Sequence, residues 1–333
     1  MRCALLVAAI AIAGLGGCKS SAREVVVYTS VDQPFSQPVF EAFEKQTGIH
    51  VRAVYDTEET KSTGVVNRLI AEAKNPQADV FWANDPVRPF LLIDRGMVEP
   101  YAAPNAAGIP APFKAADGTW TGLAARARVL LVNPKKVPSA EQPRSIKALA
   151  DARWKGQIAI ANPVFGTTTM HVAALFTAWG DERAQAFLSD LKANDVRIAS
   201  SNGEVKRLVA TGEVAFGLTD TDDAHEALED GAPVEVVYPD QDGDGTPIMP
   251  TVVVLLRSSP HGETGCQLVN YLLSADVETM LAAKAAQMPL RAGVPVPKGV
   301  RSVGELRAFA MDYPSVAKTM ARIQPVLRTW AGL

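Results

Sequence analysis

Cysteine is scarce in this sequence, which holds only three in 333 residues. Cys3 falls within an N-terminal leader and Cys18 directly after it is a candidate for acylation, so Cys266 remains as a lone thiol. A single remaining cysteine excludes an intramolecular disulfide. The apolar residues Leu268 and Val269 nearby favour a buried structural thiol over a nucleophile.

The sequence also lacks an excess of charge of either sign. Its 33 Lys and Arg residues face 36 Asp and Glu, which gives a net charge of −3 at pH 7. Proteins that bind nucleic acid usually carry a basic face, so this class of function is not expected. After the leader, no apolar run approaches the ~20 residues that a transmembrane helix needs.

Signatures of catalysis are missing too. The four histidines are scattered and show no HExxH spacing. No GxSxG, Walker-type loop or GxGxxG opens a helix in the context that each motif requires. We therefore expect a protein that is not an enzyme and holds no cofactor. An exported hydrolase with an aspartate-bound metal is the alternative from a different class.

The N-terminus reads as an export signal. Arg2 precedes an apolar run over residues 4–15, too short to span a membrane. Residues 15–18, LGGC, resemble a bacterial lipobox, which implies a signal peptide over 1–17 and acylation of Cys18. Residues 18–23 then form a lipidated tether, and the protein is placed in the periplasm or at the cell surface, anchored to the membrane. A plain secretory signal cut after Ala22 is the alternative.

Alternating strands and helices follow the tether. Buried strands are predicted over residues 24–30 and 78–82, and amphipathic helices come between them. This order predicts an α/β fold with a largely parallel sheet covered on both faces. Roughly 310 residues exceed what one core usually supports, so two lobes are expected. We assign 24–122 to lobe 1, 123–248 to lobe 2, 249–295 to a return into lobe 1, and 296–333 to C-terminal helices that pack on lobe 2.

The most informative stretch is GEVAFGLTDTDDAH, residues 212–225. A buried strand is predicted over residues 213–218, followed by a polar burst. In open α/β sheets, ligands bind beyond the carboxyl ends of the strands. Asp220, Asp222 and Asp223 are therefore expected either to face a cleft, where they would hold a cationic group or hard cation, or to cap the next helix.

A second candidate is an anion-binding seat at a predicted helix start. Gly166, Thr167 and Thr168 could present backbone N–H groups and hydroxyls to a carboxylate, phosphate or phosphonate. Ser30, in the other lobe, would complete this seat across the cleft. The alternative is that Thr167 merely caps its own helix.

Two arginines lie near the predicted crossing between the lobes. In the strand that carries them, side chains on one face should enter the core and those on the other should enter the cleft. A guanidinium can bind an anion through two parallel hydrogen bonds. We expect Arg126 to contact the solute. Arg128 is the better candidate for a salt bridge between the lobes.

Three further residues follow strands at the same rim, and all three are expected to contact a ligand: Asp32, Glu58 and Asn84. For Glu58, a solvated charged loop is an equally good interpretation.

Several segments resemble one protein family. They are short and are distributed along most of the chain after the leader: residues 26–30, 78–82, 122–133, 162–163 and 238–243. In these the chain resembles the extracellular solute-binding proteins of bacterial ABC importers, and in particular the ferric-iron-type (iron(III)-binding) family. The resemblance implies a two-lobed periplasmic-binding-protein fold, type II-like, with a mixed sheet and helices in each lobe and a ligand cleft between them.

The chain departs from this family at one important place. Iron-holding members resemble each other in a tyrosine pair just after the strand that corresponds to residues 213–218, where this chain has Thr221, Asp222 and Asp223. The family's metal ligands therefore cannot be transferred. We expect a monomeric, lipid-anchored binding protein that captures a small anionic or zwitterionic solute, with a phosphonate or phosphate group, and delivers it to an inner-membrane ABC permease. The alternative is ferric iron or a metal chelate as the transported ligand.

Overall fold

The structure, a computed structural model, describes residues 23–56 and 64–333. The predicted signal peptide, Cys18 and Glu58 lie outside the described residues. Within the described part of the chain, no helix combines the length and apolar character needed to cross a membrane.

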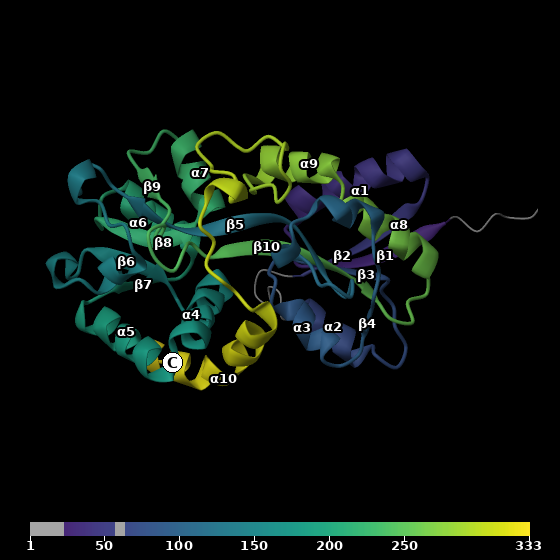
Figure 1. The fold of residues 1–333 in the computed structure, drawn as a ribbon, viewed down its shortest axis with the longest axis horizontal. Coiled ribbons are helices and arrows are strands. Elements are labelled where there is room, and N and C mark those ends of the chain that lie inside the picture. The colour runs from purple at the N-terminus through teal and green to yellow at the C-terminus, as the bar shows by residue number, and fades with distance from the viewer. Residues whose placement is uncertain (1–22, 57–63) are drawn as a thin grey trace, which may run out of the picture.

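One half of the molecule, on the right in Figure 1, is built on three parallel strands. In β1 (Glu24–Thr29), Val27 pairs with Ala53 of β2 (His50–Tyr55) on one side and with Val80 of β3 (Val80–Ala83) on the other. Because both faces of β1 and β3 are covered, these strands are almost wholly buried and read as continuous apolar runs. The covering helices are α1 (Gln33–Thr47), α8 (Gly262–Leu272) and α9 (Ala275–Ala285) above the sheet in this view, and α2 (Gly64–Ala71) and α3 (Arg88–Ile93) below it.

The other half contains a second set of strands. β8 (Phe216–Asp220) and β6 (Ile158–Ala161) run parallel, and β7 (Arg197–Ala199) extends the sheet from β6. The helices of this half are α4 (Gly166–Trp179), α5 (Asp181–Ala193) and α10 (Tyr313–Ala331) on one side, and α6 (Asn202–Ala210) and α7 (Thr221–Glu229) on the other (Figure 1).

Two long strands connect the halves. β5 (Thr121–Val132) pairs antiparallel with β10 (Ile248–Leu256) along its first part, and β10 in turn pairs with β3. From Arg128 onward, β5 pairs instead with β8 and with β9 (Glu235–Val237). The short β4 (Val98–Glu99) also pairs with β10. The register between β5 and β10 shifts beside Pro250, opposite Ala124, whose φ of 45° marks a β-bulge.

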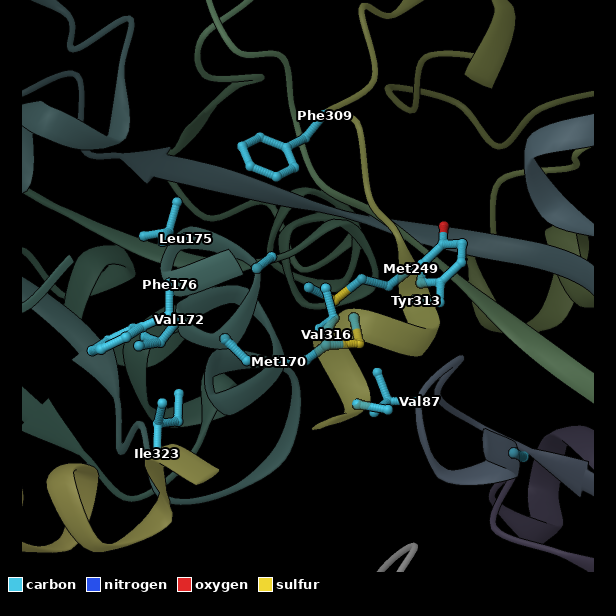
Figure 2. Packing of buried hydrophobic residues seen from close by; sticks show 14 of the residues in the cluster. Val87, Met170, Val172, Leu175, Phe176, Met249, Phe309, Tyr313, Val316 and Ile323 are labelled. Carbon is cyan, nitrogen blue, oxygen red and sulfur yellow. The ribbon is translucent and has the colours of Figure 1, made fainter. Parts of the chain in front are cut away.

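Apolar contacts also join the two halves below this crossing. Tyr313, at the start of α10, stacks edge-on against Trp120 at 5.7 Å, and Trp120 stacks in the same way on Phe90 of α3. The Tyr313 hydroxyl donates to the Ile248 carbonyl of β10. Figure 2 shows Tyr313 beside Met249, with Val316 and Met170 nearby in the same buried cluster. α10 also packs along α4. The lobe boundaries that we assigned from the sequence stay predictions.

Several local expectations needed correction. The strand predicted over residues 213–218 lies instead at 216–220, so Thr219 and Asp220 belong to the sheet, where Asp220 pairs with Arg128. The strand that carries Arg126 and Arg128 is long, from Thr121 to Val132, because its first part pairs with β10 and its last part with β8. The C-terminal region contributes one α-helix, α10, and a single 3-10 turn at Val303–Glu305, since Pro and Gly interrupt the preceding segment.

Candidate functional site

A cleft of about 370 Å³ opens beside the crossing strands. Its walls come from both halves of the molecule. One wall contains Asp32 and Asn84, which follow β1 and β3, and the other contains Asp222 and Asp223 of α7. Arg126 of β5 lies between them, and the segment after α9 closes one side. This position, beyond the ends of strands, is the one expected for ligand binding in open α/β sheets.

Arg126 is the central cation of the cleft. Its Nη2 donates to the Asn84 backbone carbonyl at 2.9 Å and to Asn84 Oδ1 at 3.3 Å. Its Nη1 lies 3.6 Å from a carboxylate oxygen of Asp222 and 3.8 Å from one of Asp220. Burial disfavours the charged guanidinium, but these acids outweigh it and raise the pKa of Arg126 above its usual value. The Nε atom is buried without a hydrogen-bond partner in the described structure.

Asp222 and Asp223 occupy the first turn of α7 and also line the cleft. The two interpretations that the sequence left open therefore describe the same residues, since acids in a first turn are favoured by the helix dipole. Burial first, and then the neighbouring Asp222 and Asp220, raise the pKa of Asp223 to about 7. Burial also raises the pKa of Asp222, against the opposing effect of Arg126. A positive group placed here would relieve this crowding of negative charge.

Asp220 has a different role from its two neighbours. It is only 1% exposed, and its Oδ1 accepts from Nη1 of the fully buried Arg128 at 2.6 Å. Its Oδ2 accepts from the Thr167 hydroxyl at 2.8 Å and from the Asn202 amide at 3.0 Å. Burial raises the pKa of Asp220, but Arg128 and Arg126 outweigh this effect, so the pKa is lowered. Asp220 is the N-cap residue of α7, yet its side chain makes no capping hydrogen bond.

The predicted anion seat at the start of α4 is therefore engaged by the protein itself. The Thr167 hydroxyl accepts from Arg128 and Asn202 and donates to Asp220, and the Thr168 hydroxyl accepts from Arg128 at 3.1 Å. Neither hydroxyl lines the cleft, and neither does Gly166, which begins α4 at an exposed position with φ 61°. Arg128 forms a salt bridge, as expected, but within the second half rather than between the halves.

Ser30 and Asp32 follow β1 and have separate positions. Ser30 is buried, and its hydroxyl accepts from the Asn84 backbone N–H at 2.9 Å, so it positions Asn84 rather than lining the cleft. Asp32 lines the cleft, and its contact with a ligand stays a prediction. Glu58 lies outside the described residues.

Sequence reasoning missed several residues of the cleft. His225, Glu226 and Glu229 lie three, four and seven positions after Asp222, on the same face of α7. This helical spacing was a usable signal. Lys284, in the last turn of α9, and Gln287, just after that helix, gave no such signal, because only the tertiary fold brings the end of α9 to the cleft.

The cleft is acidic as a whole. Among the described residues, five carboxylate side chains line it, against the two cations Arg126 and Lys284. The acids are Asp32, Asp222, Asp223, Glu226 and Glu229. An environment of this kind favours a solute with a positive centre over a simple anion.

Comparison with known proteins gives concordant results. A sequence model of the family described as "Bacterial extracellular solute-binding protein" matches residues 75–307. The protein named Iron uptake protein A1, from Synechocystis, is 27% identical over 318 residues, covering 92% of this chain and 86% of its own length. The putative 2-aminoethylphosphonate-binding periplasmic protein of Salmonella typhi is 29% identical over 299 residues, covering 86% of this chain and 85% of its own.

The fold is likewise shared with solved structures. The crystal structure of iron-bound HitA from Pseudomonas aeruginosa superimposes with a TM-score of 0.81, covering 92% of this chain and 99% of that one, at 23% identity. This confirms the mixed α/β periplasmic-binding-protein fold. The chain thus belongs to the bacterial extracellular solute-binding proteins, which are not enzymes but bind a small solute for an ABC transporter, and it is similar to proteins of that kind named for iron uptake and ferric-iron binding.

Proposed function

We propose that this protein captures a small polar solute with a cationic group, which Asp222 and Asp223 hold, and an anionic group, which faces Arg126. The observation that carries this proposal is that all three side chains line one cleft. Asp220, by contrast, is already neutralised by Arg128. Two carboxylates whose pKa values are raised by burial and by neighbouring carboxylates gain most from a positive partner.

The zwitterion that fits best is an amine with a phosphonate or phosphate group. A guanidinium binds such an anion with a planar fork of donors. Arg126 Nε is a buried donor with no hydrogen-bond partner in the described structure, so one donor of this fork is not used by the protein itself. A relative named as a putative 2-aminoethylphosphonate-binding protein supports this solute class.

Ferric iron or a metal chelate is the second candidate. Carboxylate oxygens of Asp220, Asp222 and Asp223 lie within 4.8 Å of one another, and hard cations prefer oxygen ligands. Relatives named as iron-uptake and ferric-iron-binding proteins also support it. No tyrosine of the described chain lines the cleft, however, and Arg126 stands beside the acids. A chelate whose anion meets Arg126 fits this site better than a bare ion.

The transport role includes a membrane partner. A monomer tethered through acylated Cys18 would deliver its solute to the ABC permease in the inner membrane. Two or more acyl chains give stable anchoring, whereas one gives a marginal hold. Labelled palmitate should be incorporated into the parent and not into a Cys18→Ala variant; equal labelling would reject the anchor.

Binding assays can separate the two solute classes. Purified protein is titrated with 2-aminoethylphosphonate and, separately, with ferric citrate, and the melting temperature is followed. A ligand at 100 times its Kd should stabilise the folded state by about 2.7 kcal/mol. The double variant Asp222→Asn/Asp223→Asn should lose the response to the true solute.

Asp276→Asn is a matched control for this double variant. Asp276 is an exposed acid in the first turn of another helix, α9. It should bind like the parent. If the double variant binds each retained solute as tightly as the parent does, the placement of the site is wrong.

A further inference from the structure

The surroundings of Asp220 resemble those of a bound anion. Its two carboxylate oxygens receive three short hydrogen bonds, from Arg128, Thr167 and Asn202, and a second guanidinium, that of Arg126, lies 3.8 Å away. Arg128 is fully buried and Thr167 is 8% exposed. Two cations, a hydroxyl and an amide directed at one carboxylate form a donor set of the kind that captures free carboxylates and phosphates.

These donors come from three separate elements. Arg128 belongs to β5, Thr167 to the first turn of α4, and Asn202 to the start of α6. The ladder between β5 and β8 is made by the backbone, and the Asp220 side chain forms no helix cap. The carboxylate therefore contributes to neither secondary structure and serves only the donor set.

We propose that Asp220 is a specificity-determining residue whose carboxylate permanently fills an anion seat formed by Arg128, Thr167 and Asn202. The seat exists in the fold, but the protein supplies its own occupant. A free anion cannot displace a covalently tethered one, whose effective concentration at the seat is very high. The second half of the cleft is thereby left with Asp222 and Asp223, which select positive charge; this consequence rests on the proposed function, whereas the seat itself does not.

The location of the seat explains how one residue could set the charge preference. Asp220 lies within 4.8 Å of the Asp222 and Asp223 carboxylates, measured between ligand oxygens. Arg126, which touches the cleft, is shared between Asp220 and Asp222. Removing the Asp220 carboxylate would leave Arg128 without its anion and open space next to the cleft. The seat would then accept a free anion, which the Asp220 carboxylate excludes in the parent.

The test is a chemical rescue of Asp220→Ala. The melting temperature is measured against rising formate, acetate or inorganic phosphate, with sodium chloride at equal ionic strength as the reference. We expect the variant to melt below the parent and to regain part of the loss, in a saturable manner, with formate or phosphate. The parent should show only the small general salt effect.

Two further variants keep this test decisive. Asp220→Asn fills the seat with an uncharged side chain of the same shape and should not respond to anions. Asp220→Ala/Arg128→Met lacks the cation and should not respond either. If Asp220→Ala does not fold by itself, its refolding yield in formate is compared with that in chloride, and a higher yield in formate is expected.

An Asp220→Ala variant that responds to anions no more than the parent, or that refolds equally in both salts, would overturn the proposal. The outcome is independent of the solute assays. The parent could fail to bind 2-aminoethylphosphonate and ferric citrate while the rescue succeeds, which would reject the proposed function and retain the anion seat.

Discussion

Arg126 and Asn84 connect the two halves of the protein across the cleft. The guanidinium, on a strand that crosses between the halves, donates to both the backbone and the side-chain oxygen of Asn84. Asn84 is in turn positioned by the Ser30 hydroxyl. The same guanidinium approaches Asp222 of α7. One side chain thus contacts both walls of the cleft and would sense any solute between them.

Arg126→Lys should weaken binding of an anion-bearing solute. Lysine keeps the charge but loses the planar fork. A hydrogen bond to a charged group contributes about 1.5–3 kcal/mol, so we expect a loss of roughly 10- to 150-fold in affinity. Calorimetric titration with 2-aminoethylphosphonate measures it. Arg257→Lys, at an exposed arginine that pairs with Glu99, is the control. Equal affinity of Arg126→Lys and the parent would exclude Arg126 from solute contact.

Asp223 should make both stability and binding depend on pH near neutrality. Its folded-state pKa of about 7 lies above the ordinary 3.8. Between these values the folded state binds a proton that the unfolded state has released. The contribution of this group to stability therefore rises as pH falls from about 7 toward 4. Affinity for a cationic group should fall over the same range, because protonation removes the negative charge.

Asp223→Asn tests both effects. The solute-free variant should be more stable than the parent at pH 8, and this difference should shrink at pH 5. Urea unfolding at the two pH values measures it, with Asp276→Asn as the control. A stability difference that does not change with pH would contradict the raised pKa of Asp223.

The sequence predicted the architecture better than the site. Strands β1 and β3 were recognisable because burial on both faces makes them continuous apolar runs. The acids after β8 were correctly placed at the end of a strand, but the two-residue shift of that strand changed the role of Asp220. Strand ends depend on cross-strand pairing, here with Arg128, which local sequence does not encode.

The proposed anion seat also depends on tertiary contacts that local sequence does not encode. Thr167 at a helix start was predicted to help bind a solute anion, and in the structure its hydroxyl donates to a carboxylate of the protein instead. Nothing local indicated that this anion is Asp220, 53 positions later in the chain. Arg126 and Arg128 show this limit too. Both guanidinia approach Asp220, but only Arg126 lines the cleft, and this difference comes from the tertiary fold.

His171 should make the protein sensitive to acid. It is 2% exposed, and neither ring nitrogen has a partner within the described structure. Burial, and then the charge of Arg128, lower its pKa to about 3, from an ordinary value of 6.5. The folded state thus excludes a proton that the unfolded state binds, so stability is lost as pH falls from 6.5 toward 3.

For a shift of this size the loss at pH 5 is about 2 kcal/mol relative to neutral pH. His171→Leu should remove this part of the acid sensitivity, so that its stability relative to the parent improves between pH 7.5 and 5. Urea unfolding at both values measures it. A constant difference between the two proteins would show that His171 takes up a proton in the folded state.

Two glycines beside the acidic cluster should respond in opposite ways to alanine. A Cβ on Gly217 of β8 would lie 2.5 Å from Val205 Cγ1 of α6 and 2.8 Å from the Ala159 backbone oxygen of β6. Since the backbone oxygen is fixed by strand pairing, the clash cannot be relieved by a rotamer change alone. Gly217→Ala should therefore cost about 1–3 kcal/mol. A Cβ on Gly203 of α6 meets nothing closer than 3.7 Å.

Gly203→Ala is accordingly the matched control, and it should stabilise the protein by about 0.5–1 kcal/mol because glycine loses more backbone entropy in a helix. Urea unfolding of the two variants gives the comparison. The clash at Gly217 would also displace α6, which carries Asn202 of the anion seat, so Gly217→Ala should lower stability and disturb Asp220 together. A Gly217→Ala protein as stable as the parent would mean that α6 can move away from β8 at little cost, and that Asp220 is held less rigidly than its hydrogen bonds indicate.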